Sequence, residues 1–304
     1  MNAYRLFDRT LITDESFSFP VDARATRAPI RLRRVSAVPL TGAIVHDVDA
    51  DTPARLRVAM DGGEVSIEHD GFSARWSAAQ LEVAESAAEH RMPLEETLER
   101  VFLPLALLIS GDDLIAFHGA AAAFGEHAVV FLGPSGVGKS STLLGCTERG
   151  ARILADDFAL ASTSPRIFPG AASVRLWRDA GTVDGARTDR PVARDTLKRS
   201  FRFDVVAERP VEPAAIVVLE RTPDAAPNLR SLRGQARLSA PLAHTFDLTN
   251  GPPSWTERRM RAAAQIVRGV DAFRFSFPPS PSGHAAHVDA LLDALAAHTE
   301  VVPG

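Results

Sequence analysis

The sequence is poor in cysteine and has no long hydrophobic segment. Cys146 is the one cysteine in 304 residues, which excludes an internal disulfide and a zinc site built from several cysteines. No apolar run approaches the roughly 20 residues that cross a bilayer, and the N-terminus lacks the basic and then apolar pattern of a signal peptide. The formal net charge of −4 gives no reason to expect nucleic-acid binding. These absences favour a cytoplasmic protein that binds neither membrane nor nucleic acid.

Lysine is scarce as well. Only Lys139 and Lys198 are lysines among the 34 basic residues, and the others are arginines. A composition biased toward arginine explains the general pattern, but a lysine that remains under such a bias is a candidate for a specific function. A compact ammonium fits between phosphate groups where the planar guanidinium does not. We therefore predict a functional role for Lys198 as well as Lys139, with a solvated surface lysine as the alternative for Lys198.

One glycine-rich segment carries the clearest chemical signal. Residues 133–140 read Gly-Pro-Ser-Gly-Val-Gly-Lys-Ser and fit the phosphate-binding pattern G-x-x-x-x-G-K-[ST]. The apolar run 128–132 predicts a strand before the segment, and residues 141–148 predict a helix after it. Backbone N–H groups and the positive end of the helix dipole would then hold phosphates. The predicted nucleotide-binding residues are Gly133, Pro134, Ser135, Gly136, Val137, Gly138, Lys139, Ser140 and Ser141.

Within this loop, Lys139 is predicted to reach the β- and γ-phosphates and to be exposed when the loop is empty. The Ser140 hydroxyl is predicted to bind Mg²⁺. Motifs of competing nucleotide-binding families are absent from the sequence. These are Asn-Lys-x-Asp of GTPases, Leu-Ser-Gly-Gly-Gln of transporter ATPases, and the His-Arg-Asp and Asp-Phe-Gly set of eukaryotic-type kinases.

The chain is predicted to have two domains. Residues 1–98 form a β-rich module, because apolar and polar residues alternate from Ala54 to Trp76 and Asp-Gly turns interrupt the alternation. Residues 99–304 form an α/β domain. Residues 179–213 are polar and Arg-rich without clear periodicity, which favours long active-site loops or a partly mobile flap. Further elements are expected as helices over 93–110, 255–270 and 284–298 and as strands over 114–124, 152–155, 215–219 and 272–277.

Polar residues at the ends of these elements complete a candidate site. Asp156 and Asp157 end the predicted strand 152–155, where carboxylates lie beside bound phosphates in an open α/β sheet. One carboxylate can hold Mg²⁺ and the other can accept the proton of an attacking hydroxyl; a helix cap is the alternative. His118 lies on the segment before the loop strand, and Arg175 could clamp a phosphate. A structural histidine and a solvated arginine are the alternatives for these two.

Three segments together resemble the C-terminal catalytic domain of bacterial HPr serine kinase/phosphorylase. They are His118-Gly119, the loop 133–140, and residues 149–157, which read Arg-Gly-Ala-Arg-Ile-Leu-Ala-Asp-Asp. The family pattern has a His-Gly strand, Gly-x-Ser-Gly-x-Gly-Lys-Ser and Arg-Gly-His-Arg-Leu-x-Ala-Asp-Asp at this spacing. The resemblance implies a phosphoenolpyruvate-carboxykinase-like α/β fold with a P-loop, and it implies ATP and Mg²⁺. It also implies that Asp156 is the base toward a serine hydroxyl and that His118 lies close to the transferred phosphate.

The sequence also departs from this family. Ser173 stands where the family has the Glu of a Glu-Val-Arg motif that helps to bind metal, although Arg175 is retained. The sequence therefore leaves open whether this position helps to bind metal and whether the protein catalyses the reverse phosphorolysis. Residues 175–177 and 188–199 resemble, more weakly, the divergent HPr-kinase-like proteins of peptide biosynthesis clusters. Some of those proteins, in lasso peptide pathways, phosphorylate a serine of the precursor peptide.

The sequence thus predicts an ATP- and Mg²⁺-dependent kinase that phosphorylates a hydroxyl. The predicted acceptor is a serine of a peptide or small protein, such as a biosynthetic precursor peptide. Asp156 is the predicted base, and Asp157 and Ser140 are the predicted metal ligands. The charge of the transferred group would be neutralised by Lys139, His118, Arg175 and Lys198. A kinase for a small-molecule hydroxyl or free amino acid, and a non-catalytic ATP-sensing regulator, are the alternatives. The acceptor, the exchange of roles between the two Asp residues, and the oligomeric state, including a homo-oligomer, stay open.

Overall fold

The computed structural model describes most of the chain as a mixed α/β protein with several sheets. The described residues are 1–21, 28–48, 55–86, 92–111, 113–170, 173–177, 186–191, 198–223, 226–279 and 285–299. Contacts divide the chain into two compact units. Unit 1 comprises Met1–Asp112, Arg190–Ser200 and Asp247–Arg258, and unit 2 comprises Asp113–Asp189, Phe201–Phe246 and Arg259–Gly304. Residues 99–112, which the sequence assigned to the second domain, therefore group with the first unit. Among the described residues, no helix combines the length and the apolar character needed to cross a membrane.

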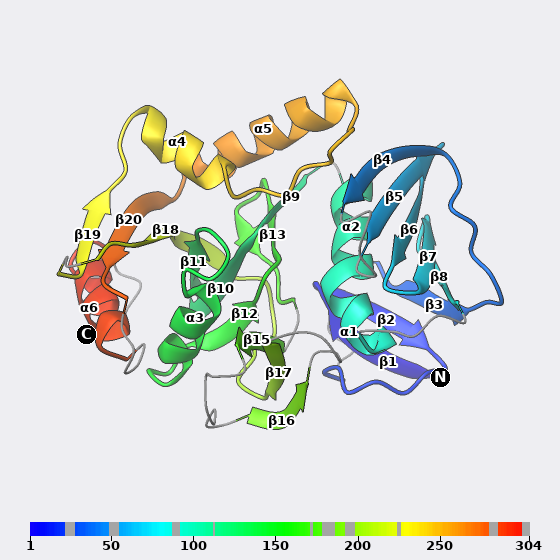
Figure 1. The fold of residues 1–304 in the computed structure, drawn as a ribbon, viewed down its shortest axis with the longest axis horizontal. Coiled ribbons are helices and arrows are strands. Elements are labelled where there is room, and N and C mark those ends of the chain that lie inside the picture. Colours follow the sequence, from blue (N-terminus) through cyan, green and yellow to red (C-terminus); the bar gives the residue numbers. More distant parts are fainter. Residues whose placement is uncertain are drawn as a thin grey trace. The chain divides into compact units, whose positions relative to one another are not determined.

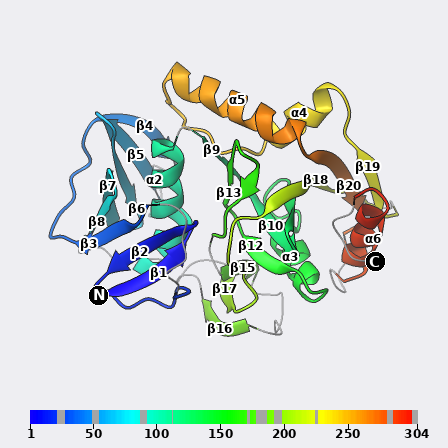
Figure 2. The same ribbon diagram turned by 180° about the vertical axis from the view of Figure 1, so that it is seen from behind.

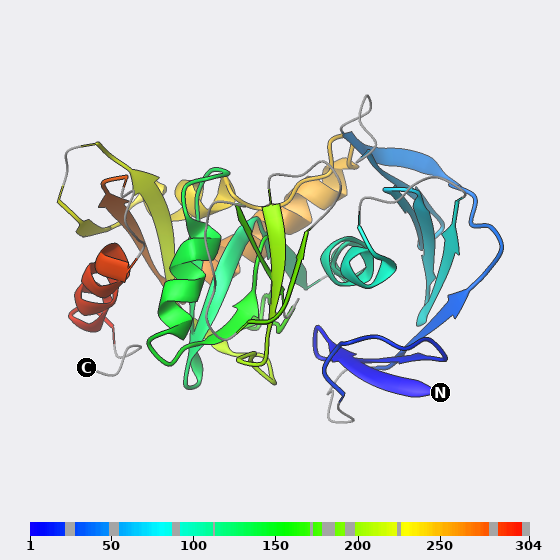
Figure 3. The ribbon, with the colours of Figure 1, turned by 60° about the horizontal axis from the view of Figure 1, so that its bottom comes forward.

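Unit 1 is built on one eight-stranded sheet with the strand order β1-β2-β3-β8-β7-β6-β5-β4. Figure 3 shows the strands curving around the helix α2 (Leu103–Ser110), which is seen end on. Every residue of α2 from Leu103 to Ile109 is buried, as expected for a helix that is apolar on all sides. The bounds are β1 (Asn2–Leu6), β2 (Arg9–Thr13), β3 (Ile30–Arg34), β4 (Ala43–Val48), β5 (Leu56–Asp61), β6 (Glu64–His69), β7 (Phe72–Ser77), β8 (Gln80–Glu85), α1 (Leu94–Thr97) and η1 (Leu98–Phe102).

The meander predicted from Ala54 to Trp76 is confirmed as β5, β6 and β7. Its two turns have two central residues each, and all four have positive φ: +54° and +98° at Gly62 and Gly63, +52° and +80° at Asp70 and Gly71. Two positive φ angles in a two-residue turn match the right-handed twist of the flanking strands. The Gly62-Gly63 and Asp70-Gly71 turns therefore fix the register of this part of the sheet.

Unit 2 has a six-stranded sheet in the order β12-β10-β11-β18-β20-β19 (Figures 1 and 2). The central pairs β11–β18 and β18–β20 are parallel, and the outer pairs are antiparallel. Its elements are β10 (Gly119–Phe124), β11 (His127–Leu132), α3 (Lys139–Thr147), β12 (Arg152–Ala155), β18 (Glu212–Arg221), β19 (Asn228–Ser231), α4 (Gln235–Leu242), β20 (Asp271–Phe277) and α6 (Ala285–Ala296). Helix α5 (Pro253–Arg268) precedes β20. Small sheets join β14 (Arg166–Ile167), β13 (Ala159–Ser162) and β9 (Leu114–Phe117), and β15 (Ser173–Trp177), β17 (Lys198–Phe203) and β16 (Ala186–Pro191).

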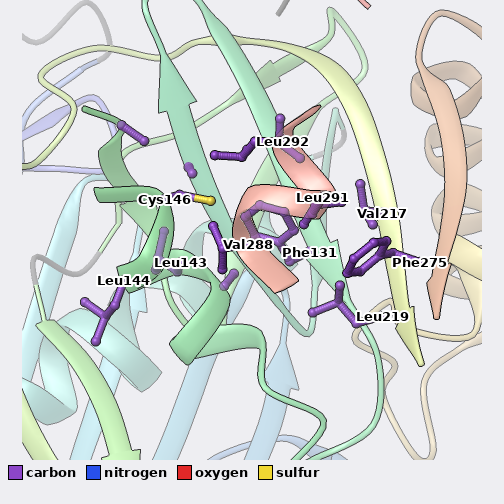
Figure 4. Packing of buried hydrophobic residues seen from close by; sticks show 14 of the residues in the cluster. Phe131, Leu143, Leu144, Cys146, Val217, Leu219, Phe275, Val288, Leu291 and Leu292 are labelled. Atoms are coloured by element: carbon purple, nitrogen blue, oxygen red, sulfur yellow. The ribbon is translucent and has the colours of Figure 1, made fainter. Parts of the chain in front are cut away.

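Both faces of the six-stranded sheet are buried at its central strands, because β10 is apolar throughout and β11 is apolar after His127. On β11, Val129 and Phe131 face one cluster while Val130 and Leu132 face the other. Helices α3 and α6 cover the first face (Figure 4), and α4 and α5 cover the second. A Cβ on Gly145 of α3 would lie 2.7 Å from Val288 of α6. Glycine at this position therefore permits the close packing of α3 against α6.

Two sequence predictions for this region are wrong. The strand expected over 114–124 is two strands, β9 and β10, which belong to different sheets and are separated at His118. The loops expected over 179–213 contain β16, β17 and the start of β18. In β17, Phe201 and Phe203 are buried and alternate with Arg202, a period of two that the surrounding arginines obscure. Residues 179–185 and 192–197 of this stretch lie outside the described residues.

Cys146 provides a test of this packing. It is fully buried in the cluster between α3 and α6, and burial raises the pKa of its thiol to about 12, against a smaller opposing effect of the Arg149 charge. The thiolate is the reactive form. We expect iodoacetamide at pH 8 to leave Cys146 unmodified in the native protein and to modify it completely in guanidinium. Since the chain has no other cysteine, native-state alkylation at the unfolded rate would contradict this packing.

Candidate functional site

The glycine-rich loop joins the C-terminal end of β11 to the N-terminus of α3. Gly133, Gly136 and Gly138 have φ angles of +144°, +79° and +117°, a range that side chains with a Cβ rarely adopt. A Cβ on Gly133 would also lie 2.9 Å from the carbonyl oxygen of Leu219 on β18. The strand, turn and helix predicted from the sequence are thus confirmed. The glycines allow the chain to turn sharply and to begin α3 directly at Lys139.

Lys139 is buried, which differs from the exposed position predicted for it. Its Nζ donates hydrogen bonds to the carbonyl oxygens of Gly133 at 2.9 Å and Pro134 at 3.1 Å. The side chain therefore folds back over the loop that precedes it, and the loop carbonyls take the place of solvent around the ammonium. This contact keeps the positive charge of Lys139 at the N-terminus of α3. The helix dipole also favours an anion at this end of the helix, so both would attract a phosphate.

A buried carboxylate connects this helix to two neighbouring strands. Ser140 Oγ donates to Asp156 Oδ1 at 2.7 Å, and the backbone N–H of Arg175 donates to Asp156 Oδ2 at 2.9 Å. Asp156, directly after β12, is only 3% exposed. The structure therefore brings together the last residue of the loop, the first Asp of the pair and the middle of β15.

The next residue, Asp157, differs from Asp156 in exposure and conformation. Its side chain is half-buried, and its φ is +68°. A left-handed conformation is uncommon outside glycine, although Asp tolerates it better than most residues. Because the backbone turns at this point, the two consecutive carboxylates occupy different environments: the first is enclosed by hydrogen bonds, and the second is partly open to solvent.

His118 lies at the break between β9 and β10, and its side chain is exposed. Its backbone N–H donates to the carbonyl oxygen of His244 at 2.7 Å. The pKa of His244 is lowered by burial first, and then by the positive charges of Lys139 and His118. Sequence reasoning missed His244, because it stands in no motif and follows α4, far along the chain from the loop. Its only sequence signal is its residue type.

The remaining predicted residues are placed as follows. Arg175 is half-buried in β15 and contacts Asp156 through its backbone N–H. Ser173, at the position where the resembling family has Glu, is buried at the start of the same strand. The backbone of Lys198 begins β17, but its side chain lies outside the described residues, so its predicted role stays a prediction.

A pocket of about 410 Å³ adjoins the glycine-rich loop. Arg221 closes one side, where its Nε donates to the Val137 carbonyl oxygen at 3.1 Å. Arg274 on β20 and Glu220 on β18 form an ion pair, with 3.9 Å between Arg274 Nη1 and Glu220 Oε2. The pocket thus combines loop backbone with apolar and charged side chains. Its lining residues are Pro134, Ser135, Gly136, Val137, Val218, Leu219, Glu220, Arg221 and Arg274.

The oxygen atoms at the end of the loop are suitable ligands for a small, hard cation. Ser140 Oγ and the Asp156 carboxylate supply oxygen atoms within hydrogen-bond distance of each other, and Mg²⁺ in proteins takes one or two such ligands together with phosphate oxygens and waters. In the described part of the chain, no group of three or more His, Cys, Asp or Glu side chains is arranged to hold a metal. These residues therefore fit Mg²⁺ accompanied by a phosphate better than a metal enclosed by protein alone.

Comparisons with known proteins add little to this geometry. No family model matches the chain, and no curated protein matches it. Among solved structures, the chain matches the HPr(Ser) kinase/phosphatase from Coxiella burnetii with 14% sequence identity and a TM-score of 0.32, over 60% of this chain and 90% of that one. At this similarity the functional assignment rests on the residues of the site.

Proposed function

We propose that this protein is an ATP- and Mg²⁺-dependent kinase. It transfers the γ-phosphoryl group to the hydroxyl of a serine in a peptide or small protein. The observation that carries the proposal is the hydrogen bond from Ser140 to Asp156. It brings the end of a phosphate-binding sequence motif to a pair of carboxylates, which is the combination that phosphoryl transfer requires. The acceptor class comes from the sequence resemblance.

The nucleotide would lie along the loop. Backbone N–H groups of Gly133 and residues 135–141 and the N-terminus of α3 would bind the phosphates. Lys139 would leave the carbonyl oxygens of Gly133 and Pro134 and bind the β- and γ-phosphate oxygens, since these are stronger partners for an ammonium. The adjoining pocket, lined in part by Arg221 and Arg274, would accommodate the nucleoside.

The geometry favours an exchange of the two Asp roles, an alternative that the sequence left open. Asp156 is buried and accepts a hydrogen bond on each oxygen, so it fits a fixed metal ligand beside Ser140. Asp157 is half-buried, so a hydroxyl can reach it more readily. Mg²⁺ bound by Ser140 and Asp156 would neutralise phosphate charge. We therefore assign the base to Asp157 in place of Asp156.

The reaction then balances as follows. Asp157 accepts the proton of the acceptor hydroxyl as its oxygen forms a bond to the γ-phosphorus. The bond from that phosphorus to the β–γ bridging oxygen breaks, and ADP leaves with the electron pair. Lys139 and His118 would stabilise the charge on the transferred group.

A transfer assay separates this proposal from its alternatives. The protein is incubated with Mg²⁺ and γ-labelled ATP, with a short peptide pool containing one serine, a matched pool with alanine in its place, or free L-serine. We expect label in the serine pool only. Label in free serine alone would favour the small-molecule kinase, and saturable ATP binding without transfer to any acceptor would favour the regulator. Absence of ATP binding would overturn the proposal entirely.

A further inference from the structure

A short segment after α4, residues 244–246, is fixed beside the strand that leads to His118. The carbonyl oxygen of His244 accepts the His118 N–H at 2.7 Å, and the Phe246 N–H donates to the Ala116 carbonyl oxygen at 2.8 Å. Thr245 forms a β-bridge with Phe117. The segment therefore lies alongside β9 and extends its small sheet by one short bridge.

Side chains hold the segment from two other directions. Arg259 of α5 donates to Thr245 Oγ1 at 2.8 Å. The Phe246 ring contacts the ring of Phe158, the residue after Asp157, with centroids 5.8 Å apart. The segment is thus tied to α5 and to the connection that carries the paired carboxylates. A histidine on it has a defined position relative to the site.

Two basic groups lie near His244. Burial lowers the pKa of its side chain most, and the charges of Lys139 of α3 and His118 of the β9–β10 connection lower it further. His244 therefore shares its surroundings with the lysine of the loop and with His118. These positive charges destabilise the charged form of His244, and a bound phosphate would oppose their effect.

We propose that His244 binds the terminal phosphate of the nucleotide together with Lys139 and His118. This inference rests on the proposed function and adds to it a residue that recognises ATP in preference to ADP. The γ-phosphate is the group that ATP has and ADP lacks. Loss of a hydrogen bond to it would therefore weaken ATP binding and leave ADP binding almost unchanged.

The test compares two nucleotides by titration calorimetry with the full chain and Mg²⁺. The ligands are ADP and the ATP analogue with an imido β–γ bridge. The variant is His244→Ala, and the matched control is His127→Ala. His127 is the first residue of β11, at the opposite end of that strand from the loop. We expect His244→Ala to weaken binding of the ATP analogue roughly tenfold, the usual effect of losing a hydrogen bond to a charged group. ADP binding should change less than twofold, and the control should match the wild type.

A second measurement uses the wild type alone, and so does not depend on the variant's folding. Calorimetry in buffers of different ionisation enthalpy counts the protons taken up on binding. We expect greater uptake with the ATP analogue than with ADP, because the γ-phosphate raises the pKa of His244. Equal uptake for both ligands, or equal weakening of both by His244→Ala, would overturn the inference while leaving the proposed function standing. A wild type that binds neither nucleotide would overturn both.

Discussion

Lys139→Ala is expected to reduce phosphoryl transfer by roughly three orders of magnitude, the scale on which charge-stabilising groups act in such reactions. No other side chain of the glycine-rich loop can bridge the β- and γ-phosphate oxygens. The fold should survive, because Lys139→Ala loses two hydrogen bonds to loop carbonyl oxygens, worth about 1.5–3 kcal/mol each, but also removes the cost of burying the ammonium. Label transfer from ATP and the thermal unfolding midpoint measure the two effects separately.

Lys139→Arg is the matched control for charge. It keeps a cation at the N-terminus of α3 but replaces a compact ammonium with a planar fork. We expect it to lose most transfer as well, since the space between the Gly133 and Pro134 carbonyls is fitted to an ammonium. If Lys139→Ala retains near-wild-type turnover with Mg²⁺ and ATP, the assignment of this loop is wrong.

The second large effect is expected at the paired carboxylates. Asp157→Asn keeps the shape of the side chain but cannot accept a proton. It should lower the transfer rate by roughly two to four orders of magnitude, as loss of a general base does, with nucleotide affinity little changed. Transfer rates at saturating Mg²⁺ and nucleotide measure this effect.

Asp156→Asn is the informative partner variant. An amide can still accept from the Arg175 N–H and donate to Ser140 Oγ, whose hydroxyl reverses its role, so both native contacts have a neutral replacement. The fold should therefore change little, while the Mg²⁺ concentration needed for half-maximal transfer should rise. If instead Asp156→Asn shows the rate loss at saturating Mg²⁺ and Asp157→Asn shows the metal effect, the roles revert to those predicted from the sequence.

The parts of the site that the sequence predicted are local in the chain. The glycine-rich loop, β11 and α3 follow from eight consecutive residues and their apolar neighbours, because glycine spacing and periodicity act within a few positions. The meander of β5 to β7 was predictable for the same reason, since its turns are encoded by adjacent Asp and Gly residues.

The parts that the sequence missed depend on contacts between distant segments. His244 reaches His118 through a β-bridge that joins residues far apart in the chain, and no local pattern marks that pairing. The environment of Asp156 likewise depends on Ser140 and on the backbone of Arg175, so two adjacent carboxylates looked equivalent in the sequence. In β17 the arginines that alternate with Phe201 and Phe203 concealed a strand.

The central claim is that ATP binds on the glycine-rich loop beside Asp156, and amide hydrogen exchange tests it most directly. Exchange is followed in the full chain with and without Mg²⁺ and the imido analogue of ATP, at concentrations that saturate binding. Bound phosphates would occupy the backbone N–H groups of Gly133 and residues 135–141 and hold the segment around Asp156 and Asp157. The account predicts slower exchange in peptides covering these two segments, and no protection in Lys139→Ala at the same nucleotide concentration. Unchanged exchange in the loop at saturation, with protection confined to other segments, would contradict it.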